Sequence, residues 1–76
     1  MDFYQIAIRN GKIELQDMDQ HAVKTATGAE LADFNRACEE LDSDGHEIYW
    51  AASTDHPEQH TKDAAIIAFV KNFKSY

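Results

Sequence analysis

The chain has little of several residue types that build specialised folds. Its 76 residues include one cysteine, one proline and three glycines, and no apolar run approaches the roughly 18 residues of a membrane-spanning helix. A single cysteine, Cys38, can form neither an internal disulfide nor a four-thiolate zinc site. Residues 1–20 lack the basic segment followed by an apolar one that a secretory signal requires. We therefore expect a cytoplasmic protein held together by packing alone.

Positive charge is also scarce. Lysine and arginine number 7 against 14 aspartates and glutamates, which gives a net charge of −7. Because nucleic-acid-binding proteins gain affinity from basic patches that displace counterions, this balance argues against direct binding to DNA or RNA. The chain is nonetheless 43% hydrophobic, as is typical of a folded protein and not of a disordered one. Its length leaves room for a single domain, residues 1–76.

Two short strands are predicted at the start of the chain, over residues 3–9 and 12–17. Asn10-Gly11 between them favours a type I′ hairpin turn, because both residues tolerate positive φ. This turn pairs Ile8 with Ile13, so one face of the hairpin collects the apolar side chains of Tyr4, Ile6, Ile8, Ile13 and Leu15. The other face collects Gln5, Ala7, Arg9, Lys12, Glu14 and Gln16, which we expect to lie in water.

A helix is predicted over residues 28–43. Thr27 and Glu30 have the spacing of a capping box at its start, and Gly45 can end it in the left-handed conformation. One apolar stripe runs along it, formed by Leu31, Phe34, Cys38 and Leu41. Residues 18–26 could form either a short strand or a connection, and the pattern does not decide between them.

A further strand and a second helix complete the predicted fold. Residues 46–52 alternate, with Ile48 and Trp50 on one side and Glu47 and Tyr49 on the other. Asp55-His56-Pro57-Glu58 is typical of a helix N-terminus, and the helix is predicted to run nearly to Tyr76 with Ile66, Phe69, Val70 and Phe73 buried. The fold class is therefore α+β, a small antiparallel sheet with two helices packed on one face, in the order β-β-(β)-α-β-α.

The residues give little support to catalysis or metal binding. Cys38 lies within an apolar stripe, where a cysteine is normally a small buried hydrophobe and not a nucleophile. His56 and His60 have i, i+4 spacing with Asp63 nearby, but Pro57 pushes His56 out of the helical region and the zinc-protease pattern is not matched. We expect no enzyme activity and no cofactor, and the two histidines leave a small metal-binding protein as the least favoured alternative.

Charge placement is the feature with the clearest functional meaning. Residues 37–61 contain no lysine or arginine and seven acids: Glu39, Glu40, Asp42, Asp44, Glu47, Asp55 and Glu58. At about 100° per residue, Glu30, Asp33, Glu40 and Asp44 also fall on one side of the first helix, so an acidic ridge is predicted there. Like charges at helical spacing repel weakly, so folding does not favour such a ridge.

A partner protein could favour the ridge. We expect a non-enzymatic interaction module whose carboxylates cover a basic protein surface, and plausible contacts are Glu30, Asp33, Glu39, Glu40, Asp42, Asp44, Glu47 and Tyr49. Where the partner binds nucleic acid, these groups would stand in for phosphates and inhibit it. In size and charge the chain resembles phage-encoded inhibitors of host defence such as anti-CRISPR proteins, which share no motif. The alternative is a structural or regulatory subunit that pairs, as a homodimer or in a complex, through a sheet edge or the aromatics Phe3 and Tyr49.

Overall fold

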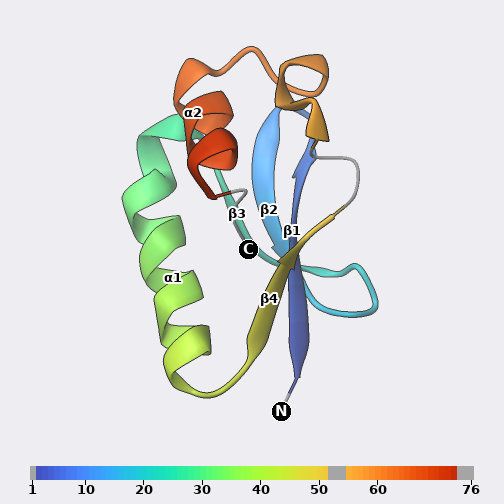
Figure 1. The fold of residues 1–76 in the computed structure, drawn as a ribbon, viewed down its shortest axis with the longest axis vertical. Helices are drawn as coiled ribbons and strands as arrows, with labels where there is room; N and C mark the ends of the chain where they lie inside the picture. The colour runs from blue at the N-terminus through green and yellow to red at the C-terminus, as the bar shows by residue number, and fades with distance from the viewer. Residues whose placement is uncertain (1, 52–54, 74–76) are drawn as a thin grey trace.

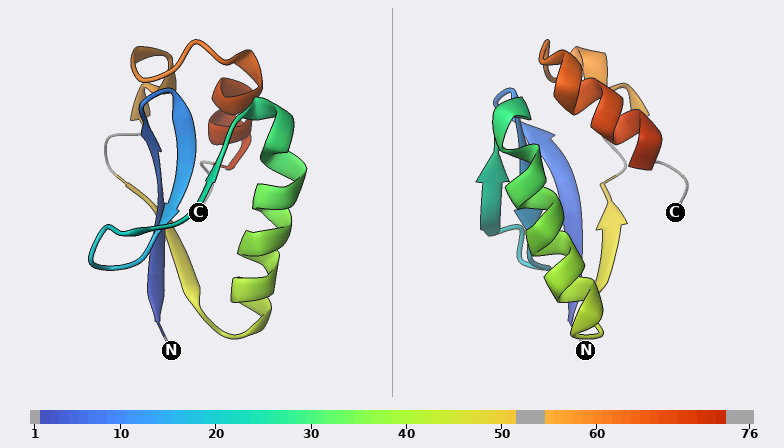
Figure 2. Two further views of the ribbon diagram at one scale, coloured as in Figure 1. Left: turned by 180° about the vertical axis from the view of Figure 1, so that it is seen from behind. Right: turned by 90° about the vertical axis from the view of Figure 1, so that its left-hand side faces the viewer.

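The computed structural model describes residues 2–51 and 55–73, which form a four-stranded sheet and two α-helices. Both helices lie on one face of the sheet (Figures 1 and 2). The elements, in chain order, are β1 (Phe3–Arg9), β2 (Lys12–Gln16), β3 (Ala22–Ala26), the 3₁₀ turn η1 (Gly28–Glu30), α1 (Leu31–Ser43), β4 (Glu47–Trp50), the 3₁₀ turn η3 (Pro57–Gln59) and α2 (Ala64–Phe73). The α+β class and the predicted element order are therefore confirmed.

The hairpin register is the predicted one. Asn10 and Gly11 have φ values of 55° and 77°, as a type I′ turn requires, and Ile8 pairs with Ile13 across β1 and β2. Residues 18–26, which the sequence left as either a strand or a connection, contain the strand β3. This strand pairs antiparallel with β2, with a register shift at Leu15/Gln16. The hairpin thus supplies the two central strands of the sheet.

The fourth strand differs from the prediction in its direction. The strand order is β3-β2-β1-β4, and β4 runs parallel to β1, with Tyr4 beside Ile48. The sheet is therefore mixed and not purely antiparallel. Helix α1 is the reason, because it carries the chain along the face of the sheet from the β3 edge to the opposite edge (Figure 2), as parallel connections require.

The core lies between the sheet and the helices. The predicted stripes of both helices point into it: Phe34 and Cys38 of α1 and Ile66 and Val70 of α2 are buried. They pack against Ile6, Ile8, Ile13, Leu15, Ala26 and Ile48 of the sheet. Phe69 contacts the rings of Phe34, Trp50 and Phe73, which closes the core on the β4 side. Within the described residues, neither helix is long and apolar enough to cross a membrane.

The predicted start of the second helix is wrong. The residues around Pro57 form only the short turn η3, and α2 begins at Ala64. Asp63 caps α2, because its Oδ1 accepts the N–H of Ala65 at 3.0 Å. Its Oδ2 accepts the N–H of Gly28 at 3.0 Å. The far end predicted for this helix, residues 74–76, lies outside the described residues, as does residue 52 of the predicted strand 46–52.

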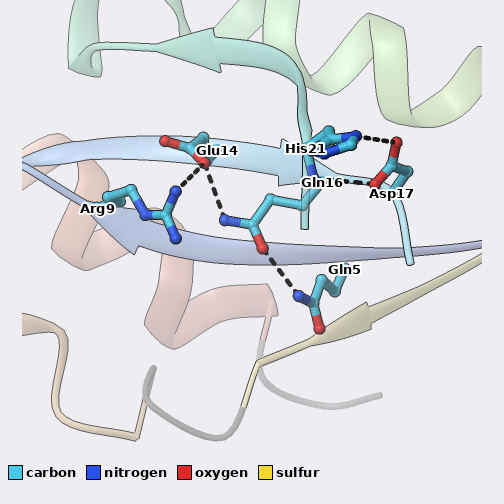
Figure 3. A network of polar contacts seen from close by, with 6 residues as sticks. All are labelled: Gln5, Arg9, Glu14, Gln16, Asp17 and His21. Carbon is cyan, nitrogen blue, oxygen red and sulfur yellow. Dashed lines mark hydrogen bonds and ion pairs between the residues drawn. The ribbon is translucent and has the colours of Figure 1, made fainter. Parts of the chain in front are cut away.

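The prediction that the face of the sheet away from the helices lies in water is wrong for part of that face. Ala7, Glu14 and Gln16 on this face are only 8%, 7% and 3% exposed. Gln16 donates to the Glu14 carboxylate at 2.9 Å and accepts from Gln5 at 2.8 Å, and Arg9 lies 3.8 Å from the same carboxylate (Figure 3). Polar side chains that satisfy one another in this way can be buried without a covering helix.

Candidate functional site

Five of the predicted contact residues gather where α1 ends and β4 begins. Glu39, Glu40, Asp42, Asp44 and Glu47, which we call the acidic end, are all exposed. The turn between α1 and β4 lies at one extremity of the molecule (Figure 1). The acidic end is therefore presented to solvent at a single pole.

The acidic end has little neutralising charge of its own. Over residues 2–51 and 55–73, the ion pairs are those of Glu14, Asp17, Asp33 and Glu58, and none involves the five carboxylates of the acidic end. The nearest arginine in sequence, Arg36, pairs with Asp33. The Glu47 carboxylate instead accepts a hydrogen bond from the Tyr49 hydroxyl. These carboxylates are available to an external cation.

The other two members of the predicted ridge have structural roles. Glu30 belongs to η1 and not to α1, and its carboxylate accepts the hydroxyl of Thr27 at 2.8 Å and the Thr27 N–H at 3.3 Å. The capping box is thus confirmed. The hydroxyl bond lowers the pKa of Glu30, so its stabilisation is present above the ordinary glutamate pKa and is lost as pH falls through the lowered value. Asp33 is held by Arg36. The ridge is therefore shorter than predicted.

Three residues of the acidic end, Glu40, Asp42 and Asp44, lie at the electrostatically unfavourable end of α1. A helix C-terminus carries a partial negative charge, which favours cations and disfavours anions by roughly 0.3–1 kcal/mol each. The last turn of α1 has no basic residue, and it contains Glu40 and Asp42 with Asp44 at the C-cap. By contrast, α2 has Lys71 in its last turn. The negative charges of Glu40, Asp42 and Asp44 thus reduce the stability of α1.

Shallow hollows adjoin the acidic end on more than one side. One, along α1, is lined by Arg36, Glu39, Glu40, Ser43 and Asp44, and two others share Asp42 and Ile48. The first of these two, between α1 and the end of α2, is lined by Asn35, Cys38, Glu39, Asp42, Ile48 and Phe73. The other, beside β4, is lined by Asp42, His46, Glu47, Ile48 and Tyr49. We call these two adjoining hollows the groove; its apolar residues include Cys38, Ile48 and Phe73, and its acids are Glu39, Asp42 and Glu47. The ridge predicted from helix phase was Glu30, Asp33, Glu40 and Asp44, so it did not indicate the face with Glu39 and Asp42, and nothing in the sequence indicated that Phe73 of α2 would reach it.

Tyr49 is the exposed aromatic of the site, as predicted. It is 49% exposed, and its ring stacks on Phe3 with centroids 6.0 Å apart. Its hydrogen bond to Glu47 raises the pKa of the phenol, so the ring stays neutral and keeps a polar tip. A rigid, half-exposed tyrosine beside a carboxylate is well suited to a protein interface.

The structure gives no support to a catalytic Cys38. The side chain is buried in the core, and this burial raises the pKa of the thiol to about 11. A thiol with such a pKa holds its proton at neutral pH and is a poor nucleophile. Cys38 therefore serves as a small apolar residue that lines the groove.

The histidines do not form the suspected metal site. His56 and His60 flank η3, and the Asp63 carboxylate is engaged with Gly28 and Ala65. In the described part of the chain, the ligand-type residues that come together are Asp17, Asp19 and His21, in the exposed loop before β3. Asp17 there accepts the N–H groups of Asp19 and His21, so these contacts account for the loop conformation without an ion.

Comparison with known proteins adds no relative. No protein-family model matches the chain, and no curated protein or solved structure gives a significant match.

Proposed function

We propose that this protein is a non-enzymatic interaction module whose acidic end covers a basic surface of a partner protein. The observation that carries the proposal is the placement of Glu40, Asp42 and Asp44 at the C-terminal end of α1, where the helix dipole disfavours them. A solubilising charge can stand anywhere on the surface. Charges that cost helix stability are better explained by binding, and one of them, Asp42, also lines the groove beside the exposed Tyr49.

The chemistry of the acidic end favours a partner that binds nucleic acid. Such proteins carry clusters of lysine and arginine that neutralise phosphates, and the five exposed carboxylates of the acidic end offer the same cations an alternative anion. The expected outcome is inhibition, since the carboxylates and the nucleic acid compete for one surface. A phage-type inhibitor of host defence, such as an anti-CRISPR protein, would act in this way.

Charge reversal tests this proposal. The immobilised protein is mixed with proteins of the source cell that were purified by binding to DNA, and the Asp42→Lys/Glu47→Lys variant is compared with it. Wild type should capture a basic protein and release it as salt is raised, because exposed ion pairs are screened. The variant should lose capture by at least about tenfold, since two contacts of about 1 kcal/mol would be removed and replaced by repulsion.

The matched control is Asp19→Lys/Glu58→Lys, which changes the net charge equally at exposed acids outside the acidic end. This control should keep most of the capture. Equal loss in both variants would show that only the total charge matters, and undiminished capture by Asp42→Lys/Glu47→Lys would refute the proposed role of the acidic end. Circular dichroism melts must show that both variants fold.

A second candidate function is a subunit that pairs through its outer aromatics. The stack of Phe3 on Tyr49 favours it, because both side chains are exposed, at 39% and 49%. Sedimentation separates the two functions. A dimer that strengthens with protein concentration and ignores salt supports pairing through the aromatics, whereas a monomer at all concentrations supports the acidic module.

A further inference from the structure

Among residues 2–51 and 55–73, the strand that borders the acidic end has one edge without a partner strand. In the order β3-β2-β1-β4, β4 is an outer strand, and β1 is its neighbour in this part of the chain. Glu47 donates its N–H to Asp2 of the β1 side and Ala51 donates to Ile6. Because main-chain groups alternate in direction along a strand, the N–H and C=O of Ile48 point away from β1. Ile48 also lines both hollows of the groove.

The groove places cation-binding groups along this open edge. Glu39 and Asp42 rise from α1 on one side of Ile48, and Glu47 and Tyr49 lie on the other. The apolar residues of the groove include Ile48, Cys38 and Phe73. A lysine or arginine could lay its aliphatic stem on these residues and put its charged head beside the carboxylates, and an arginine could stack on Tyr49.

We propose that the partner contributes an extended cationic segment that adds to β4 as a fifth strand. The main chain of this segment pairs with Ile48, and its alternating side chains place arginine or lysine beside Asp42 and Glu39 on one face and beside Glu47 and Tyr49 on the other. Strand addition to an exposed sheet edge is a common mode of peptide recognition. This inference rests on the proposed function, because it takes a basic partner as given.

Charge complementarity selects this occupant over a second copy of the chain. An isologous pair of β4 edges would bring Glu47 and Asp42 of one copy close to the same residues of the other, and like charges on adjacent strands are destabilising. A basic strand would instead place positive charges beside these carboxylates, and opposite charges on adjacent strands are stabilising. Aliphatic residues at intervening positions would suit the apolar residues of the groove.

Two synthetic peptides test the mode of binding. The first is a capped hexapeptide of alternating arginine and valine. The second has the same sequence, with N-methyl groups on alternate main-chain nitrogens so that one edge cannot pair with a strand. Both carry equal charge, so any difference between them reports main-chain pairing. Nuclear magnetic resonance measures affinity and the amide exchange rate of each residue in the native protein.

The first peptide should slow exchange of the Ile48 amide about tenfold or more and leave the Tyr49 amide, which already faces β1, nearly unchanged. N-methylation should weaken binding by about tenfold, the value expected for the loss of one or two main-chain hydrogen bonds. Asp42→Lys/Glu47→Lys should abolish binding of both peptides, and Asp19→Lys/Glu58→Lys should not.

Several results would overturn strand addition. Equal binding of the two peptides, without protection of Ile48, would leave charge recognition intact and refute pairing with β4. Failure of both peptides to bind at millimolar concentration would also refute it, while the capture of folded basic proteins would decide the proposed function separately. Protection of Ile48 that grows with protein concentration and needs no peptide would assign the edge to a second copy.

Discussion

At the scale of single residues, Asp63 is an acid that joins segments far apart in the sequence. Its two carboxylate oxygens accept from Ala65 at the start of α2 and from Gly28 at the start of η1. Its own N–H donates to the Thr61 hydroxyl, which in turn donates to the Gly11 carbonyl of the hairpin turn. One short segment thus joins both helices to the hairpin.

Replacement of Asp63 by alanine should therefore be costly. Asp63→Ala removes an N-cap, worth about 1 kcal/mol, and leaves the partly buried Gly28 N–H without its acceptor, which adds roughly 1–3 kcal/mol. We expect a total loss of about 2–4 kcal/mol in the free energy of unfolding, measured by urea denaturation. Asp63→Asn should lose less, and Glu58→Ala nearby should stay within about 0.5 kcal/mol. A loss as small as that of Glu58→Ala would contradict the bridging role.

Gly28 provides an internal check on this prediction. A Cβ at Gly28 would lie 2.5 Å from Asp63 Oδ1, so Gly28→Ala should destabilise the protein even though alanine normally favours helical turns. In the Asp63→Ala background the clash is absent, and Gly28→Ala should cost less or become neutral. Additive effects in the double-mutant cycle would show that the two residues are not coupled.

At the scale of elements, α1 has an acid in both its first and its last turn, and the helix dipole acts on these two acids in opposite directions. Asp33 lies in the first turn, where an acid is favourable, whereas Asp42 lies in the last turn, where it is not. Asp42→Lys should therefore raise the free energy of unfolding by about 0.5–1.5 kcal/mol, through the dipole and a new i, i+3 pair with Glu39. Thermal melts should show this as a higher Tm.

Asp33→Lys is the matched control, since it changes the net charge equally. It should lower stability by about 0.5–1 kcal/mol, because it also removes the pair with Arg36. Shifts of the same sign in both variants would mean that total charge, and not position on α1, governs stability. They would also remove the observation on which the proposed function depends.

The elements show how far local sequence signals reach. Asn10-Gly11 specified the hairpin and its register because the turn geometry depends on two adjacent residues only. The start of α2 was missed because two acids, Asp55 and Asp63, both precede possible helical residues. The structure uses Asp63, whose second oxygen is matched by Gly28, 35 residues earlier in the chain. A local pattern cannot reveal a contact of that separation.

The direction of β4 relative to β1 could not be predicted from the sequence for a similar reason. Alternation of Ile48 and Trp50 against Glu47 and Tyr49 predicts a strand and its faces, and both are observed. It carries no information on whether β4 runs with or against β1. That depends on α1 crossing the whole sheet, which is a property of the topology. The exposure of the five acids and of Tyr49 was accordingly predictable, but the groove beside them was not.

At the scale of the whole molecule, burial on the outer face of the sheet also escaped prediction. Glu14 and Gln16 alternate with apolar residues as solvent-facing positions do, yet they are buried by their own network with Gln5 and Arg9. Such a network depends on four side chains from two strands that satisfy one another. Residue type and period alone assign each of them to water.

Because of the net charge, we expect salt to increase the stability of the protein and to weaken its binding to a cationic partner. The molecule measures 33 × 23 × 23 Å, and the Debye length falls from about 30 Å at 0.01 M salt to about 10 Å at 0.1 M. At the lower concentration, nearly every carboxylate of a chain with net charge −7 repels all the others. At the higher one, repulsion is limited to close neighbours.

Sodium chloride should therefore raise Tm over this range by several degrees, since relief of about 1 kcal/mol shifts Tm by roughly 4–8 °C in a domain of this size. Binding to a cationic partner should weaken over the same range, because the screened attraction is between molecules and not within one. The Asp42→Lys/Glu47→Lys variant should show a smaller rise in Tm, as it carries less charge to screen. A Tm that falls with chloride would mean that attractive ion pairs such as Arg36 with Asp33 outweigh the repulsion, and the acidic end would then no longer be a cost that binding has to explain.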